Sequence, residues 1–376
     1  MADAEGSLGV YVHIPFCSGK CAYCDFVSFP GQKGFIDRYL KAVEAEARLT
    51  APDFKPATLY IGGGTPSELS AEEIAELFER LHRAFSGADF SEITFEANPE
   101  SLDEAKLAAL RQAGVTRLSL GLQTPEDPLL AGIGRRHTLA DFLRVYHSAR
   151  AMGTFSISVD LIFGLPGQTL EGFLKGLDQV LALEPDHLSL YGLDLHEGTP
   201  LARRGFIPDE DLGREMFESA IPRLTWAGFF HYEISNFAKP GHESKHNFNY
   251  WRGGSYAGLG CAASSHLRGV RSRNSSDLGA YLKVVEQGLR PMAESELLQD
   301  KDKLGERIML GLRCIDGLEL DQAMEEGFKS EWKDLERRGL IERQGRWARL
   351  TRDGLFLANE AFSEFVAPFK SLEVNA

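Results

Sequence analysis

Short runs of β-branched and aliphatic residues alternate with longer amphipathic stretches through the first half of this 376-residue chain. The short runs predict strands at residues 10–14, 58–61, 92–96, 117–121, 156–161 and 187–191. The amphipathic stretches predict helices at residues 34–49, 71–85, 103–113, 139–151 and 170–183. Ser70 and Thr138 precede two of these stretches, as helix N-caps do. Such alternation is typical of α/β folds, so the sequence predicts a partial (β/α)6 barrel resembling a TIM barrel or a doubly wound open sheet.

Composition and charge narrow the class of protein. The chain is 43% hydrophobic and 26% charged, which is typical of a globular protein. Its 41 Lys and Arg against 55 Asp and Glu give a net charge of −14, which disfavours a general nucleic-acid binder. No apolar run reaches the roughly 18–20 residues that span a bilayer, and the first ten residues do not resemble a signal peptide. We therefore expect a cytoplasmic protein without a transmembrane segment.

The alternation ends near residue 200. A helix is predicted at residues 212–227, and residues 231–260, rich in aromatics and glycine, are expected to be irregular. Further helices are predicted at residues 301–313, 320–326 and 331–338, followed by a hairpin at 340–350. Helices followed by a hairpin suggest a small α+β domain of winged-helix type. We therefore expect a barrel core at residues 1–200, a linking segment at 201–295 and a C-terminal domain at 296–376.

Polar and glycine-rich segments follow the predicted strands directly. A cysteine-rich loop follows the first strand, and GGGTPS at residues 62–67 follows the second. Glu96 ends the third strand, Gln123 follows the fourth, and Asp160 in the fifth leads into GLPGQT at residues 164–169. Ligands of parallel α/β folds gather at the C-terminal ends of the strands. These residues are therefore expected to meet at one rim.

Three of the five cysteines, Cys17, Cys21 and Cys24, have the spacing C-x3-C-x2-C. An odd number of cysteines argues against a disulfide scaffold. Three thiolates on one loop can hold three irons of a [4Fe–4S] cluster and leave the fourth iron open to a small molecule. Cys261 and Cys314 lie far away in the sequence and are expected to be small buried hydrophobic residues.

Two other interpretations of the cysteine loop remain open at this point. Zinc could take the three thiolates together with His13, four residues before Cys17, as a Cys3His site. Cys21 and Cys24 alone could form a redox dithiol. Neither interpretation explains why the loop opens a series of strand–helix units with a GGGT segment after the second strand.

Residues 11–26, YVHIPFCSGKCAYCDF, resemble the cluster loop of the radical S-adenosylmethionine (SAM) superfamily, specifically the oxygen-independent coproporphyrinogen III oxidase group. GGGTP at residues 62–66 and DLIFGLPGQT at 160–169 match the same group, and the similarity covers nearly the whole chain. The resemblance implies a radical SAM barrel with a [4Fe–4S] cluster on Cys17, Cys21 and Cys24. It also implies that SAM chelates the open iron and that an electron donor reduces the cluster.

The resemblance further implies which residues contact SAM. Tyr23 would lie beside the adenine, and Gly63, Gly64 and Thr65 would receive the methionine amino group. The remaining implied contacts around the rim are Glu96, Gln123, Arg135 and Asp160, with a backbone contact at Gly192. Tyr11 matches a residue near the active centre, and we treat it as catalytic as well as cofactor-binding. Taken singly, the glycines could form only a turn, and the carboxylates could be caps at strand ends.

Departures from the oxidase pattern favour a neighbouring branch, the HemW family of haem chaperones. Phe26 stands where the oxidase loop has a fourth cysteine, and the chain is expected to lack the N-terminal extension over the oxidase substrate pocket. HNFNYW at residues 246–251 matches the HNxxYW segment associated with haem binding in that family. The alternative for this segment is that His246 caps a loop while Tyr250 and Trp251 fill the core.

The resemblance thus makes His246 the first candidate haem ligand, because imidazole commonly ligates haem iron. His242 and His266 are further candidates by proximity alone. Arg268, Arg271 and Arg273 could pair with the haem propionates or could form a solvated basic surface.

Two functions follow from the resemblance. The first is a haem chaperone that binds haem and delivers it to haem-accepting proteins. The second is an oxygen-independent coproporphyrinogen III oxidase, an oxidoreductase of porphyrin biosynthesis that decarboxylates propionates to vinyl groups. Only the second requires SAM cleavage, so the sequence does not decide whether the chain is an enzyme. A winged-helix regulator with a sensing cluster is a third alternative, of a different class.

Overall fold

The computed structural model describes residues 8–50 and 55–366, and six parallel strands form the centre of its main sheet. They are β1 (Leu8–Ile14), β4 (Pro56–Gly63), β5 (Glu92–Ala97), β6 (Arg117–Gln123), β7 (Ser156–Phe163) and β8 (His187–Gly192). These strands neighbour one another in chain order, β1-β4-β5-β6-β7-β8. A doubly wound sheet would reverse its order at a switch point. The partial barrel is therefore correct, and the doubly wound alternative is wrong.

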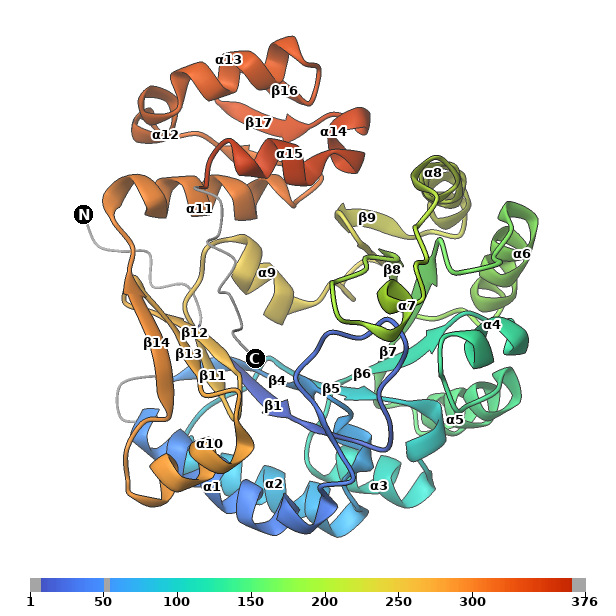
Figure 1. Ribbon diagram of the computed structural model, residues 1–376, viewed down its shortest axis with the longest axis vertical. Helices are drawn as coiled ribbons and strands as arrows, with labels where there is room; N and C mark the ends of the chain where they lie inside the picture. Colours follow the sequence, from blue (N-terminus) through green and yellow to red (C-terminus); the bar gives the residue numbers. More distant parts are fainter. Residues whose placement is uncertain (1–7, 51–54, 367–376) are drawn as a thin grey trace.

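Helices between the strands form an arc around the outside of the curved sheet (Figure 1). They are α1 (Ile36–Thr50), α2 (Ala71–Ala84), α3 (Glu104–Gln112), α4 (Asp127–Gly132), α5 (Leu139–Ala151), α6 (Leu170–Leu181) and α8 (Glu210–Trp226). Ser70 and Thr138 both form capping boxes, with Glu73 and Asp141 respectively. The predicted helices are all present, with ends that differ by a few residues.

The two faces of the parallel sheet differ because side chains alternate along each strand. In β1, Val10, Val12 and Ile14 are fully buried in the core beneath the helices, whereas Tyr11 and His13 lie on the opposite, concave face. The other strands place polar side chains at the corresponding inner positions: Tyr60, Glu96, Ser119, Asp160 and Ser189. The concave face is therefore polar, as expected of a ligand chamber rather than a second hydrophobic core.

Residues 231–260, expected to be irregular, contain regular elements, so that expectation is wrong. The elements there are β9 (Phe230–Glu233), β10 (Asn236–Ala238), α9 (Lys245–Trp251) and β11 (Tyr256–Leu259). β10 pairs antiparallel with β8, and β11 pairs parallel with β1. These strands are too short to show a periodic pattern, because their stability comes from pairing with distant strands.

Three further strands extend the β1 edge of the sheet beyond β11. They are β12 (Ser264–Leu267), β13 (Val270–Asn274) and β14 (Met292–Leu297), and all three pair antiparallel. The helix α10 (Leu278–Glu286) connects β13 to β14 and packs against α1. The sheet is thereby twelve-stranded, with β14 at one edge and β9 at the other.

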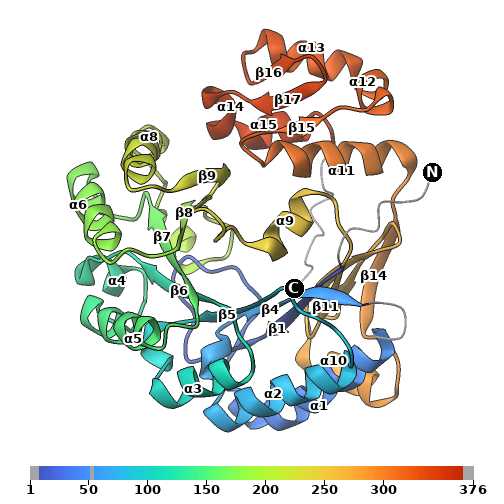
Figure 2. The same ribbon diagram turned by 180° about the vertical axis from the view of Figure 1, so that it is seen from behind.

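The C-terminal part has its own hydrophobic core, centred on the fully buried Trp332. Its elements are α11 (Asp300–Leu312), β15 (Leu318–Glu319), α12 (Gln322–Gly327), α13 (Lys329–Arg337), β16 (Ile341–Gln344), β17 (Trp347–Leu350), α14 (Arg352–Phe356) and α15 (Ala358–Ser363). These helices pack with a three-stranded sheet, β15-β17-β16, in the winged-helix-like arrangement that was predicted. Figure 2 shows this part above the open side of the barrel, with α11 next to α9.

Within residues 8–50 and 55–366, no helix has both the length and the apolar character needed to cross a bilayer. The expectation about a signal peptide concerned residues 1–10. Of these, residues 1–7 lie outside the described part of the chain.

Candidate functional site

The cysteine loop is fixed at both ends by a small sheet. β2 (Phe16–Cys17) pairs parallel with β3 (Phe29–Pro30), so the intervening loop begins and ends at the rim of the barrel. The amide of Ala22 donates to the carbonyl of Ile133 at 2.9 Å, which holds the middle of the loop against the α4–α5 connection. All three cysteines are free thiols; Cys17 is buried, and Cys21 and Cys24 are half-buried. The loop therefore presents three thiols from one defined position.

The thiols and His13 are not arranged as a Cys3His zinc site. Among the described residues, no three His, Cys, Asp or Glu side chains converge closely enough for one metal ion. His13 is also committed elsewhere: Nε2 donates to the carbonyl of Val27 at 2.9 Å, and Nδ1 accepts from the Tyr11 hydroxyl at 3.0 Å. Zinc in a Cys3His site would need that imidazole, whereas a [4Fe–4S] cluster takes one thiolate per iron.

Charges and hydroxyls lie next to the thiols. Burial raises the pKa of Cys17, while its Sγ atom lies 3.3 Å from the Thr65 hydroxyl. A guanidinium nitrogen of Arg135 lies 3.8 Å from the Sγ atom of Cys21. This guanidinium places a positive charge beside the cysteine loop. The structure thus places Arg135 and Thr65 next to the cysteine loop.

The glycines of GGGTP pass so close to β1 that side chains would not fit. Gly63 has φ +115°, and a Cβ atom there would lie 2.6 Å from Nδ1 of His13. A Cβ atom on Gly64 would lie 3.0 Å from Sγ of Cys17. The amide of Gly64 donates to the carbonyl of Ile14 at 2.9 Å, which fixes this close approach. The segment is therefore more than a turn, because it forms one side of the cysteine site.

Two half-buried carboxylates lie on the concave face. Glu96 accepts hydrogen bonds from the Tyr60 hydroxyl at 2.6 Å and from the Gly63 amide at 3.3 Å, and burial raises its pKa to about 7. Asp160 accepts from the Ser119 hydroxyl at 2.9 Å, and burial also raises its pKa. Both groups are held by donors and face the chamber, as expected of residues that receive an ammonium group or ribose hydroxyls.

Arg135 and Gln123 meet near the end of β6. Arg135 donates to the side chain of Asn98 and to the carbonyl of Gly121, both at 2.7 Å. Its buried Nε atom has no hydrogen-bond partner among the described residues. Gln123 has φ +70°, an uncommon left-handed conformation for a non-glycine residue, where β6 and β7 change register. An unsatisfied guanidinium nitrogen and a strained residue at one rim are typical of a ligand site.

Tyr23 and Gly192 complete the set of predicted SAM contacts. Tyr23 lies between Cys21 and Cys24, and burial raises its pKa. Gly192 is the last residue of β8, at the same rim, and a Cβ atom there would lie 3.1 Å from the ring of Phe163. The structure thus places every predicted SAM contact at one end of the barrel or on its concave face.

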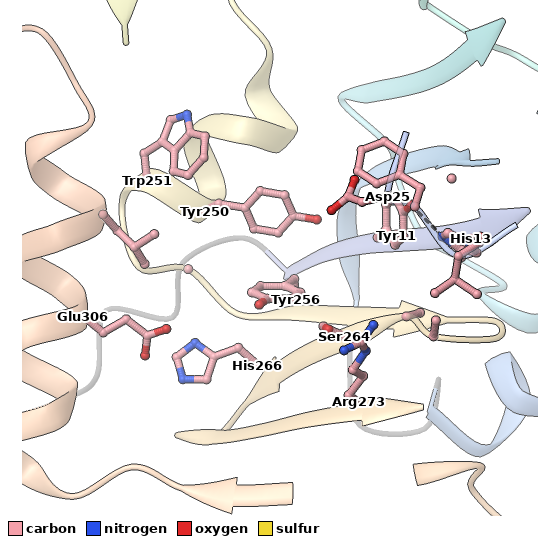
Figure 3. Close-up of a pocket in the computed structure, with 17 residues that line it drawn as sticks. Tyr11, His13, Asp25, Tyr250, Trp251, Tyr256, Ser264, His266, Arg273 and Glu306 are labelled. Carbon is pink, nitrogen blue, oxygen red and sulfur yellow. Dashed lines mark hydrogen bonds between the residues drawn. The ribbon is translucent and has the colours of Figure 1, made fainter. Parts of the chain in front are cut away.

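A cavity of about 470 Å³ lies beside this rim, between α9, the strands β11–β13 and α11 (Figure 3). Its volume is within the usual range for small-molecule sites. Among its lining side chains are Tyr11, His13, Asp25, Phe26, Tyr250, Trp251, Tyr256, Ser264, His266, Arg273 and Glu306. The cavity therefore combines aromatic walls with a few polar groups, and through Tyr11 and His13 it adjoins the cysteine loop.

Helix α9 carries the HNxxYW segment and is fixed to the barrel by its first turn. The carboxylate of Glu92 on β5 accepts from the amides of Lys245 and His246 at 3.0 and 2.9 Å. The C-terminal domain holds the other end, because the guanidinium of Arg313 lies 4.3 Å from the centre of the Trp251 ring. Tyr250 and Trp251 are thereby held in the cavity wall (Figure 3).

His246 lies behind that wall and does not line the cavity. Its Nε2 atom is 2.7 Å from the Tyr250 hydroxyl, and its Nδ1 atom is 2.8 Å from the Thr58 hydroxyl. Only 1% of the residue is exposed, and burial lowers the pKa of the ring to about 3. His242 is likewise directed elsewhere, to the Ser156 hydroxyl at 2.9 Å.

This environment predicts how His246 affects stability against pH. Its folded pKa of about 3 lies below the ordinary 6.5, so below pH 6.5 the unfolded chain binds a proton that the folded chain excludes. Relative to His246→Gln, wild type should lose about 1.4 kcal/mol of unfolding free energy per pH unit as pH falls below 6.5. Urea unfolding of wild type and His246→Gln at pH 7.5 and pH 5 measures the free energy of unfolding. An equal change between the two pH values in both proteins would contradict the prediction. His147→Gln, at an exposed position of α5, is the control, and its unfolding free energy should change with pH as that of wild type does.

Sequence reasoning missed several residues of the site. Tyr256 and Glu306 line the cavity, and Asn98 and Tyr60 hold Arg135 and Glu96. Tyr60 could have been found from the alternation within β4, which places it on the concave face. Glu306 could not, because only the packing of α11 over the sheet edge brings it to Tyr256.

Comparisons with known proteins identify two domains. The model of the radical SAM superfamily matches residues 11–180, and the model of the HemN C-terminal domain matches residues 298–357. In solved structures, this chain is similar to the coproporphyrinogen III oxidase HemN from Escherichia coli, described as a radical SAM enzyme. That likeness has a TM-score of 0.83 and 26% identity, and it covers 96% of this chain and 91% of the oxidase.

Curated relatives extend over nearly the full chain. It is 37% identical over 374 residues to the heme chaperone HemW of Bacillus subtilis, covering 95% of this chain and 98% of the relative. It is 34% identical over 353 residues to the heme chaperone HemW of Escherichia coli, covering 87% of this chain and 93% of that relative. A mitochondrial relative from Bos taurus, radical S-adenosyl methionine domain-containing protein 1, is 33% identical over 384 residues. The match covers 94% of this chain and 86% of that relative.

Proposed function

Because this chain belongs to the HemW family of the radical SAM superfamily, we propose that it is a haem chaperone that binds haem and delivers it to haem-requiring proteins. One structural observation carries the proposal. The HNxxYW segment places Tyr250 and Trp251 in the wall of a cavity of about 470 Å³ that is also lined by two histidines and an arginine. Aromatic rings pack on a macrocycle, imidazole ligates iron, and guanidinium pairs with carboxylates.

Phe26 distinguishes this function from the oxidase. It stands where the oxidase loop has a fourth cysteine, it is 60% exposed, and it lines the cavity. An exposed aromatic side chain at a cavity mouth offers a surface on which a planar apolar ligand packs. The position thus supplies contact area for a porphyrin in place of a thiol.

We further propose that Cys17, Cys21 and Cys24 hold a [4Fe–4S] cluster and that the rim residues hold SAM. The cluster, when reduced by an electron donor, supplies the electron that cleaves SAM in radical SAM chemistry. The chain's own groups do the binding: Arg135 offers an unsatisfied donor to a carboxylate, and Glu96 and Asp160 offer acceptors. Tyr11 adjoins the cysteine loop, through His13, and also lines the cavity, which supports a role for it between the SAM and haem sites.

Haem titration of the full chain, followed in the Soret band, tests the chaperone proposal. Wild type should bind one haem saturably and release it to an excess of an apo-haem protein such as apomyoglobin. Trp251→Ala should weaken haem binding about tenfold, or ~1.4 kcal/mol, because it removes an aromatic wall. Trp226→Ala is the matched control, since that side chain is 94% exposed on α8. Haem binding that does not saturate in wild type, or equal affinity of the Trp251 and Trp226 variants, would contradict the proposal.

A further inference from the structure

The cavity has a wall that the HNxxYW segment does not supply. The strands β12 and β13 contribute His266 and Arg273, and α11 contributes Glu306 (Figure 3). The Nε2 atom of His266 is buried and has no hydrogen-bond partner among the described residues. Burial also lowers the pKa of His266, so the ring is neutral near pH 7. A neutral imidazole with an uncommitted nitrogen is the form that ligates iron.

Burial lowers the pKa of His246 as well, but His246 differs from His266 in its hydrogen bonds and in its position. Both of its ring nitrogens are hydrogen-bonded, and Tyr250 separates it from the cavity. To reach an iron atom it would have to leave Thr58 and Tyr250 and move out of a fully packed position. Breaking buried hydrogen bonds in this way costs about 1–3 kcal/mol for each group left without a partner.

Two tyrosine rings, Tyr250 and Tyr256, connect the two histidines. The ring centres of His246 and Tyr250 are 4.9 Å apart, those of Tyr250 and Tyr256 are 4.6 Å apart, and those of Tyr256 and His266 are 6.2 Å apart. Each pair meets edge to face, with interplanar angles of 82°, 81° and 70°. A change at His246 therefore reaches the cavity through the position of Tyr250.

We propose that His266, and not His246, is the axial ligand of haem iron in this cavity, and that His246 is a positioning residue for Tyr250. The proposal rests on the haem-chaperone function and assigns its ligand. Tyr250, Tyr256 and Trp251 supply the aromatic walls for the macrocycle, and Arg273 supplies a cation for a propionate. Haem iron gains one iron–nitrogen bond, and no electron is transferred.

In the proposed haem complex, Glu306 would be the outer partner of His266. Its Oε2 atom is buried without a hydrogen-bond partner among the described residues, and its charge acts on His266. A ligating histidine commonly donates its second ring N–H to a carboxylate, which fixes the ring and strengthens it as a ligand. Arg271 lies 3.4 Å from the other carboxylate oxygen of Glu306 and holds that side chain in place.

Ferric haem added to the full chain tests the assignment. His266→Ala should lower haem affinity at least tenfold and shift the Soret band from that of a histidine-ligated haem. Imidazole added to His266→Gly should restore the wild-type band, because it occupies the vacated position. His246→Ala should weaken binding without moving the band, and His246→Gln, which keeps a hydrogen-bonding group for Tyr250, should restore affinity. His147→Ala, on the exposed face of α5, is the control for adventitious surface ligation.

The outcomes separate this inference from the function on which it rests. Saturable haem binding with the same band and affinity in wild type and His266→Ala would overturn the inference and leave the chaperone function standing. Loss of the histidine-ligated band in His246→Ala but not in His266→Ala would overturn it as well. Wild type that binds no haem would overturn the chaperone function itself. Circular dichroism of each variant shows that it is folded, and the imidazole rescue of His266→Gly separates loss of a ligand from loss of structure.

Discussion

Replacing Cys17, Cys21 and Cys24 together by alanine should remove nearly all iron and sulfide from protein that has been reconstituted anaerobically. Each thiolate would anchor one iron of the proposed cluster, and nowhere else in the described residues are three or more His, Cys, Asp or Glu side chains arranged to hold a metal ion. Wild type should hold about four irons and four sulfides per chain, with a broad visible absorption that the triple variant lacks. Iron and sulfide analysis with visible spectra measures both.

The chain supplies a matched control for the cysteine experiment. Cys261 is buried, and burial raises its pKa to about 12, so it remains a protonated thiol. Cys314 is likewise free, and burial raises its pKa to about 11. The double variant Cys261→Ser and Cys314→Ser should keep its full iron content. Stoichiometric zinc in place of iron after anaerobic purification, or iron retained by the triple variant, would contradict the cluster assignment.

Gly63→Ala should weaken SAM binding to cluster-loaded protein at least tenfold, or ~1.4 kcal/mol. The new Cβ atom would lie 2.6 Å from Nδ1 of His13 in a backbone with φ +115°, so either the His13 ring or the GGGTP segment must move. Strain and overpacking together should also cost about 2–5 kcal/mol of stability. Isothermal titration with SAM measures the first effect, and urea unfolding measures the second.

Gly87→Ala separates the effect of backbone strain from the effect of overpacking. Gly87 also has a positive φ, +82°, but a Cβ atom there meets nothing within 4 Å. It should therefore lose about 1–2 kcal/mol of stability from backbone strain and keep its SAM affinity. Equal SAM affinity for folded Gly63→Ala and wild type would remove the GGGTP segment from the proposed SAM site.

Much of the barrel could be predicted because its central strands carry a local pattern. In β1, alternation of buried Val10 and Val12 with polar Tyr11 and His13 marks both the strand and its two faces. The rim residues follow from the same pattern, because parallel strands end together. Strand–helix alternation does not show the order of the strands in the sheet. The partial barrel was therefore distinguished from the doubly wound sheet only by the observed strand order.

The cavity could not be predicted because its walls come together only in the folded chain. Tyr256 lies on β11, which is four residues long and pairs with β1 across more than half of the sequence. Glu306 reaches the cavity because α11 packs above α9, where Arg313 contacts Trp251. The resemblance pointed to His246 by its motif, yet its hydrogen bonds to Thr58 and Tyr250 depend on how α9 packs against β4.

The chaperone and oxidase functions differ most directly in what the protein does with coproporphyrinogen III. Cluster-loaded protein should be given that compound anaerobically with SAM and a reductant, and in parallel should be titrated with haem. The account predicts a saturable haem Soret shift and no formation of protoporphyrinogen IX. Turnover to protoporphyrinogen IX, together with haem binding no tighter than that of an unrelated protein, would contradict it and assign the chain to the oxidase function.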